Sequence, residues 1–191
     1  MARHAPIALP PSHVDLAIAR AWARSATRRR ENSLKPLTWL ADERLVLGAT
    51  ALFWLYTRGR KRAPAVAHHA NRMLLSVAIG SAVPHLFKYV VRRRRPDRTV
   101  IRHGRRHGAP RSGNAWDSFP SGHAVHMGAI AGPLTALAPG WLRPFVWPLA
   151  AALAGTRTLL LAHYPSDVGA GLAIGFALDR AVRALSRLRY P

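Results

Sequence analysis

The chain has 191 residues, of which 49% are hydrophobic, and its 29 Lys and Arg against 8 Asp and Glu give a formal charge of +21. The length favours one domain, and the absence of cysteine excludes disulfides, thiolate metal sites and a cysteine nucleophile. Such a charge is typical of proteins that bind nucleic acid, an acidic membrane surface or a polyanionic substrate. The basic residues gather at the ends of apolar runs, as in helices that stop at lipid headgroups.

Residues 1–44 are predicted to form a basic N-terminal extension. Apolar residues such as Val14 and Trp22 recur among arginines over residues 12–30, which indicates an amphipathic helix lying at the membrane interface, with Ser12 as its N-cap. A soluble basic extension explains the same pattern and stays open. The first residues lack a sustained apolar run, so no cleavable signal peptide is expected.

Residues 45–191 are predicted to form a membrane-embedded domain. The first apolar run, 45–56, is short for a span unless the segment begins near residue 37. Four further runs cover residues 73–91, 119–138, 141–162 and 167–185. They are rich in Gly, Ala and Pro, as in tightly packed membrane helices, and they lack strand-type alternation. The fold class is therefore predicted to be all-α, a polytopic membrane helical bundle of about five spans plus the N-terminal helix.

Three clusters of polar residues fall on one side of the membrane when the predicted spans are traced in alternating directions. The clusters are Lys88 with Arg95 and Pro96, then Pro120 to His123, then Arg157 with His163 and Asp167. Cations, a helix start, two histidines and a carboxylate are the groups needed to hold and transfer a phosphate. An enzyme is therefore the leading interpretation.

Lys88 and Arg95 are seven residues apart, so on a continuous helix ending at Pro96 they would point the same way. Arginine offers a planar fork to phosphate oxygens, and lysine offers a point charge. Contact with lipid headgroups is the alternative for the arginines of residues 92–95. Lys88 lies inside an apolar run, where an ionisable group suggests a function.

The sequence Pro120-Ser121-Gly122-His123 is typical of a helix start. The free N–H groups and the positive end of the helix dipole form an anion site there. Gly122 permits close approach of an oxyanion, the Ser121 hydroxyl can donate to it, and His123 can face a leaving group. An ordinary capped helix is the alternative.

The third cluster places Arg157 six residues before His163. Pro165 prevents His163 and Asp167 from sharing an unbroken helix, so Asp167 should open the next helix. A tight turn would then bring its carboxylate to the His163 ring, fixing the tautomer and making the other ring nitrogen a better nucleophile. Asp167 as a plain N-cap stays open.

In these motifs the chain resembles the type 2 phosphatidic acid phosphatase family, whose pattern is K-x6-RP, PSGH and SR-x5-H-x3-D. The order and all internal spacings match, and the departure is Thr156 in place of the serine before Arg157. Both side chains carry a hydroxyl. The superfamily also contains soluble acid phosphatases and vanadium haloperoxidases.

The resemblance implies a two-step hydrolysis through a phosphohistidine, with no metal and no cofactor. His163 would attack phosphorus, Asp167 would orient it, and His123 would protonate the leaving oxygen and then activate water. The residues that would hold the phosphoryl oxygens are Lys88, Arg95, Ser121, Gly122 and Arg157. The other histidines of the loops lack carboxylate partners at metal-ligand spacing.

Further candidates lie around the predicted site. Trp116 and Asp117 precede the second motif and are candidates for the substrate mouth. They belong to a basic polar segment, residues 97–118, that is predicted to form a loop over the site. His126 follows His123 by three positions and is a candidate to touch the substrate or tune His123, with a buried structural histidine as the alternative.

The sequence therefore predicts an integral membrane lipid phosphatase, in which residues 45–191 are the membrane-embedded phosphatase domain. Its substrate would be an isoprenoid diphosphate such as undecaprenyl diphosphate, or phosphatidate or phosphatidylglycerol phosphate. A soluble-type acid phosphatase or vanadate peroxidase and a non-catalytic membrane- or polyanion-binding protein are the alternatives. No nucleic-acid-binding motif is visible, so nucleic acid is not an expected partner. We expect a bacterial inner-membrane location with the site facing the periplasm, and the sequence predicts no oligomeric state.

Overall fold

Residues 7–59, 64–101 and 114–189 are described by the computed structural model, and they are mostly helical. The elements in chain order are β1 (Ile7–Ala8), α1 (His13–Ser25), α2 (Arg28–Trp39), α3 (Glu43–Arg58), α4 (Pro64–Val90), β2 (Val91–Arg92), α5 (Pro96–Thr99), α6 (Gly122–Leu137), α7 (Arg143–Leu159) and α8 (Pro165–Arg189). Most of the basic loop expected over the site, residues 102–113, lies outside the described residues.

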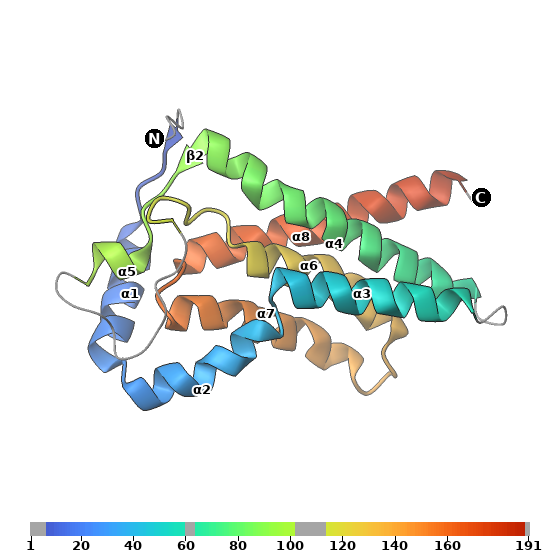
Figure 1. Ribbon diagram of the computed structural model, residues 1–191, viewed down its shortest axis with the longest axis horizontal. Coiled ribbons are helices and arrows are strands. Elements are labelled where there is room, and N and C mark those ends of the chain that lie inside the picture. The colour runs from blue at the N-terminus through green and yellow to red at the C-terminus, as the bar shows by residue number, and fades with distance from the viewer. Residues whose placement is uncertain (1–6, 60–63, 102–113, 190–191) are drawn as a thin grey trace.

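The five long helices α3, α4, α6, α7 and α8 form an elongated bundle, in which α6 packs against α4, α7 and α8 (Figure 1). Helix α6 is apolar and largely buried, as a central helix must be. Small residues set the spacing between α6 and α8. A Cβ on Gly175 would collide with the backbone carbonyl of Val125, and one on Gly128 with that of Leu172. Close backbone approach of this kind is typical of packed membrane helices.

The predicted apolar runs correspond to the five bundle helices. The run 45–56 lies within α3, which starts at Glu43 behind the N-cap Asp42. Among the helices of the described residues, α4 alone has the length and hydropathy expected of a membrane span. A bundle of five spans therefore stays a prediction.

A buried ion pair links α4 to α8 in the half of the bundle that contains the C-terminus. One guanidinium nitrogen of Arg72 donates to both carboxylate oxygens of Asp179 at 2.8 Å. Both side chains are almost fully buried. Gly132 of α6 leaves room for this pair, because a Cβ there would come within 2.5 Å of the Asp179 carboxylate.

The N-terminal helices α1 and α2 lie at the opposite end of the bundle, where α6 and α8 begin (Figure 1). Helix α1 starts as predicted at the N-cap Ser12, which forms a capping box with Asp15. Its buried residues are Asp15 and Ala19, whereas Val14 is 66% exposed. One face of α1 thus contacts the protein, and an apolar side chain remains on another face.

Candidate active site

The catalytic candidates meet at the end of the bundle where α6 and α8 start. His163 lies in the buried turn between α7 and α8, and Nη1 of Arg95 is 3.1 Å from its Nε2. Burial, followed by the charges of Arg95 and Arg157, lowers the pKa of His163 well below its usual 6.5. His123, in the first turn of α6, is also close enough to act electrostatically on His163. The imidazole of His163 is therefore neutral near pH 7.

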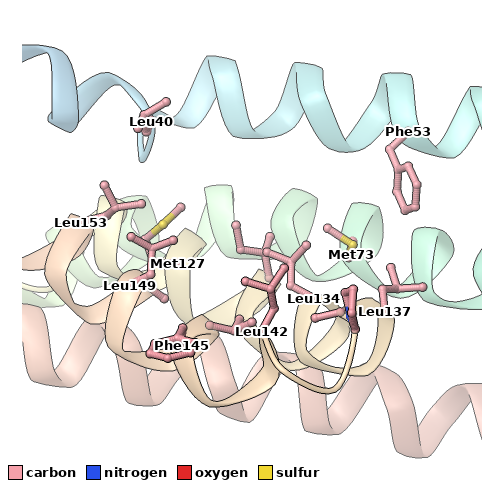
Figure 2. A pocket seen from close by; sticks show the side chains of 15 residues that line it. Leu40, Phe53, Met73, Met127, Leu134, Leu137, Leu142, Phe145, Leu149 and Leu153 are labelled. Atoms are coloured by element: carbon pink, nitrogen blue, oxygen red, sulfur yellow. The ribbon is translucent and has the colours of Figure 1, made fainter.

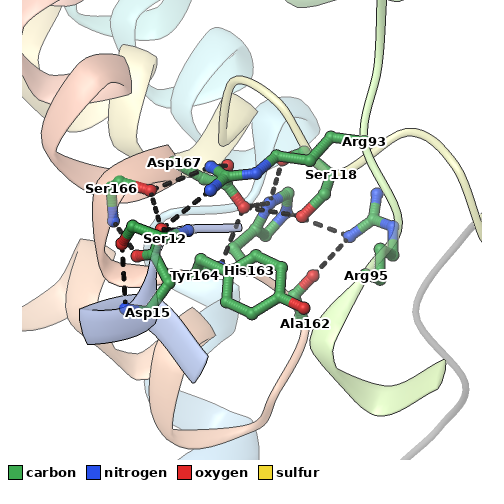
Figure 3. Close-up of polar contacts among 10 residues, drawn as sticks. All are labelled: Ser12, Asp15, Arg93, Arg95, Ser118, Ala162, His163, Tyr164, Ser166 and Asp167. Carbon is green, nitrogen blue, oxygen red and sulfur yellow. Dashed lines mark hydrogen bonds and ion pairs between the residues drawn. The ribbon is translucent and has the colours of Figure 1, made fainter. Parts of the chain in front are cut away.

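The hydrogen bonds of His163 define its tautomer. Nδ1 lies 2.6 Å from the backbone carbonyl of Ser118, which can only accept, so the proton is on Nδ1 (Figure 3). Nε2 then carries the lone pair and accepts from Arg95. An unprotonated Nε2 facing a cation is the arrangement that a nucleophile for phosphorus requires.

Contrary to the sequence prediction, Asp167 does not hydrogen-bond directly to the His163 ring, because Ser118 lies between them. Its Oδ2 is 3.8 Å from Nδ1 of His163 but accepts from the Ser118 hydroxyl at 2.6 Å and from the Tyr164 amide at 2.8 Å. Its Oδ1 accepts from Arg93. The direct contact of carboxylate and imidazole is thus replaced by one through Ser118, because the Ser118 carbonyl occupies the position beside Nδ1.

Arg95 is held in place by three backbone carbonyls. Its nitrogens donate to the carbonyls of Asn114, Ala162 and Asp117, each at 2.9 Å. These bonds, from the segment before α6 and from the turn before α8, hold the guanidinium against the His163 ring.

Buried donors at the same end of the bundle, without partners among the described residues, are suited to an anion. Ser121 is the N-cap of α6, and its buried hydroxyl has no partner among the described residues. The buried Nε of Arg157 is likewise without one in the same part of the chain. Gly122 opens α6, whose first N–H groups lack intrahelical partners. Buried donors left open in this way are what a phosphate group would satisfy.

The predicted geometry of Lys88 and Arg95 on one helix is wrong. Helix α4 ends at Val90, and residues 91–92 form β2, which pairs in parallel with β1. The backbone stays extended to Arg95, so the two cations are not two helical turns apart. Lys88 is half-buried, and no hydrogen bond joins it to another residue that the structure describes.

The remaining candidates lie around the site in different ways. The Trp116 ring contacts the guanidinium groups of Arg92 and Arg94. The Asp117 backbone carbonyl binds Arg95. His126 is buried and its Nε2 lies 3.1 Å from the Ser81 hydroxyl of α4, as expected of a structural histidine.

Sequence reasoning missed Arg93, Ser118 and Asp15. Arg93 is only 3% exposed and binds both Asp15 and Asp167. In the sequence it stands in a run of four arginines, where nothing distinguishes it from a residue that contacts headgroups. Ser118 acts on His163 through its backbone carbonyl, for which residue identity gives no signal.

Metal ligands do not gather at this site. Within residues 7–59, 64–101 and 114–189, no group of three or more His, Asp or Glu side chains is arranged to hold a metal ion.

Comparison with known proteins finds similarity over the part of the chain that contains the three motifs. A family model described as the PAP2 superfamily matches residues 69–190. The lipid A 1-phosphatase of Rhizobium johnstonii is 36% identical over 128 residues, which are 65% of this chain and 52% of the relative. The decaprenylphosphoryl-5-phosphoribose phosphatase of Mycobacterium tuberculosis is 38% identical over 104 residues, 54% of each chain. The chain thus spans about half the length of these curated relatives.

Two solved structures share the fold. The crystal structure of Aquifex aeolicus LpxE has a TM-score of 0.68 at 15% identity and covers 93% of this chain and 99% of that one. The transmembrane PAP2-type phosphatidylglycerolphosphate phosphatase of Bacillus subtilis has a TM-score of 0.65 at 19% identity, over 93% and 87% of the two chains.

Proposed function

Because the chain belongs to the PAP2 superfamily, we propose that it is a metal-independent membrane lipid phosphatase that works through a phosphohistidine. One observation carries the proposal. Nε2 of His163 is unprotonated, because Nδ1 donates to Ser118, and it is held beside the cation Arg95. This nitrogen is the nucleophile.

In the first step, Nε2 of His163 forms a bond to phosphorus while the bond from phosphorus to the lipid oxygen breaks. His123 gives a proton to the departing oxygen. Arg95, Arg157 and Ser121 stabilise the negative charge on the phosphoryl oxygens. In the second step, His123 takes a proton from water, the water oxygen bonds to phosphorus, and the bond to Nε2 breaks. The products are inorganic phosphate and the lipid alcohol, or the lipid monophosphate when the substrate is a diphosphate.

An apolar pocket next to the site supports a lipid substrate. The pocket has a volume of about 530 Å³ and is lined by residues of α3, α4, α6 and α7, by the turn between α6 and α7, and by Leu40 (Figure 2). Met127 lines it one helical turn after His123. Leu40 also lines it, two residues after Thr38, whose backbone lies beside His123. We assign this pocket to the hydrocarbon tail of the substrate, with the phosphate at His163.

The lipid class is narrowed by the anion site and the pocket together. A phosphate or diphosphate on an isoprenoid or acyl lipid fits both, which includes undecaprenyl diphosphate, phosphatidate and phosphatidylglycerol phosphate. The curated relatives are named for lipid A and for a decaprenyl-linked phosphoribose, so a phosphorylated glycolipid joins these candidates.

We propose five spans, α3, α4, α6, α7 and α8, in a bacterial inner membrane with the site on the periplasmic side. Helices α1 and α2 add basic residues to the site end, so the charge count alone favours a cytoplasmic site. However, Arg93 and Arg95 are engaged inside the protein and do not count toward headgroup contact. A reporter enzyme that is active only in the periplasm, fused before residue 1, tests this orientation. Activity supports a periplasmic site, and inactivity contradicts it.

The activity is tested with detergent-purified protein in EDTA. We expect phosphate release from one of the lipid classes above by wild type and none by His163→Ala. With para-nitrophenyl phosphate, whose leaving group needs little protonation, His123→Ala should release a burst of about one equivalent of nitrophenol and then stall. Release that requires an added metal, or that survives His163→Ala, contradicts the proposal.

A further inference from the structure

Helix α1 makes a polar contact with the turn that carries His163. Oδ1 of Asp15 accepts from the backbone amide of Ser166 at 3.1 Å, and Oδ2 accepts from the Ser166 hydroxyl at 2.7 Å (Figure 3). Asp15 is 2% exposed, so this carboxylate is committed to the protein interior. The partners are 151 residues apart in the chain.

The same helix makes an apolar contact with the start of the turn. Ala19 packs with Leu161 and Tyr164 in a small buried core. Leu161 has φ 51°, in the left-handed region that a leucine rarely adopts. Such a conformation persists only where its surroundings hold it, and here the leucine side chain is fully buried in this core. The strained residue is two positions before His163.

Arg93 connects Asp15 to the groups around the nucleophile. Its Nη2 donates to Asp15 at 2.7 Å, and its Nη1 donates to Asp167 and, at 2.8 Å, to Ser166. Asp167 in turn accepts from the Ser118 hydroxyl, and the Ser118 carbonyl holds Nδ1 of His163. A continuous series of buried contacts thus runs from α1 to the imidazole.

We propose that Asp15 is a positioning residue for the nucleophile, acting through Arg93, Ser166 and Asp167 to hold the His163 turn. This inference rests on the proposed function. Asp15 lies outside residues 69–190, which carry the family match, and in a segment that the sequence assigns to a membrane-surface extension. Neutralising it leaves Arg93 with a single carboxylate and releases one side of the turn.

The test compares Asp15→Asn with Ser12→Ala in steady-state hydrolysis of short-chain dioctanoyl phosphatidate. Asp15→Asn should lower kcat by about 10- to 100-fold with KM changed less than about threefold, because small displacements of a reacting group slow chemistry more than binding. Ser12→Ala removes the α1 cap but leaves the contacts of Asp15 with Arg93 and Ser166. It should lower the melting temperature while kcat per folded protein stays near the wild-type value. Such a split separates positioning from helix stability.

Ser166→Ala and Ser166→Thr provide a second test that does not depend on the folding of Asp15→Asn, since Ser166 is on the surface. Alanine should lower kcat several-fold, and threonine, which keeps the hydroxyl, should restore it. A wild-type kcat in folded Asp15→Asn overturns the inference but not the proposed function. If Asp15→Asn does not fold, a wild-type kcat in Ser166→Ala has the same meaning. No hydrolysis by wild type, of this substrate or of the lipid panel, overturns the proposed function and the inference with it.

Discussion

Ser118 contacts both His163 and Asp167, with a different group for each. Its backbone carbonyl accepts from Nδ1 of His163, and its hydroxyl donates to the Asp167 carboxylate, each over 2.6 Å. The carboxylate therefore orients the imidazole indirectly, by fixing the residue whose backbone holds the ring. In the direct pair that the spacing of His163 and Asp167 suggested, the Asp167 side chain alone would orient the imidazole.

This arrangement predicts unequal effects at the two positions. Ser118→Ala keeps the carbonyl bond to His163 and should lower kcat about tenfold, the scale of one lost hydrogen bond. Asp167→Asn places an amide NH2, which cannot accept a hydrogen bond, against Arg93 or against the donors Ser118 and Tyr164. We therefore expect kcat to fall further, by about 100-fold or more. Steady-state hydrolysis of dioctanoyl phosphatidate measures both. A Ser118→Ala loss as large as that of Asp167→Asn would contradict the indirect role.

Filling the apolar pocket should change chain-length preference. Leu149 and Leu153 line the pocket on α7, and Leu153→Trp would occupy part of its volume. We expect activity on a long-chain lipid phosphate to fall about tenfold or more, because overpacking displaces an apolar ligand. Activity on para-nitrophenyl phosphate should be unchanged.

Leu52→Trp is a matched control, since Leu52 is 69% exposed and does not line the pocket. Equal losses on the long-chain and the nitrophenyl substrates in Leu153→Trp would show damage to the site instead of exclusion of a tail.

The depressed pKa of His163 predicts a pH-dependent stability. Burial, then Arg95 and Arg157, keep the folded pKa well below 6.5, while unfolding returns it to about 6.5. Below pH 6.5 the unfolded chain therefore binds a proton that the folded chain does not. Stability should fall as the pH drops below 6.5, by up to about 1.4 kcal/mol per pH unit.

His163→Asn keeps a donor for the Ser118 carbonyl but does not titrate. Thermal unfolding in detergent between pH 7.5 and 5 should show a steeper decrease in melting temperature for wild type than for this variant. Parallel decreases would mean that His163 is not held neutral by the fold.

The Arg72–Asp179 pair predicts a stability effect far from the chemistry. Arg72→Leu leaves the Asp179 carboxylate buried without its partner and should lower the unfolding free energy by about 3–5 kcal/mol. The double variant Arg72→Leu/Asp179→Leu should recover most of this loss, because no isolated charge remains. Thermal unfolding of the two proteins side by side is the measurement. A double variant less stable than Arg72→Leu would contradict this account.

The sequence was sufficient to predict the bundle helices, because apolar runs bounded by Pro, Gly and charged residues have few other structures. It also predicted which motifs lie at one end, since successive helices alternate direction. It singled out Arg95, but it did not predict that Arg93 also points inward. Residues 91–95 are extended, so side chains alternate: Arg93 and Arg95 are buried, whereas Arg92 and Arg94 contact Trp116. That alternation depends on pairing with β1, a partner more than 80 residues away.

The contact between Asp15 and Ser166 also has a consequence for biosynthesis. Helix α1 is synthesised before the turn that it binds, and Arg93, which contacts both, is made between them. The His163 turn can therefore be held in place only after α1, Arg93 and the turn itself have come together. A chain synthesised only to the end of α7 already contains His123 and Arg95 but does not yet contain His163.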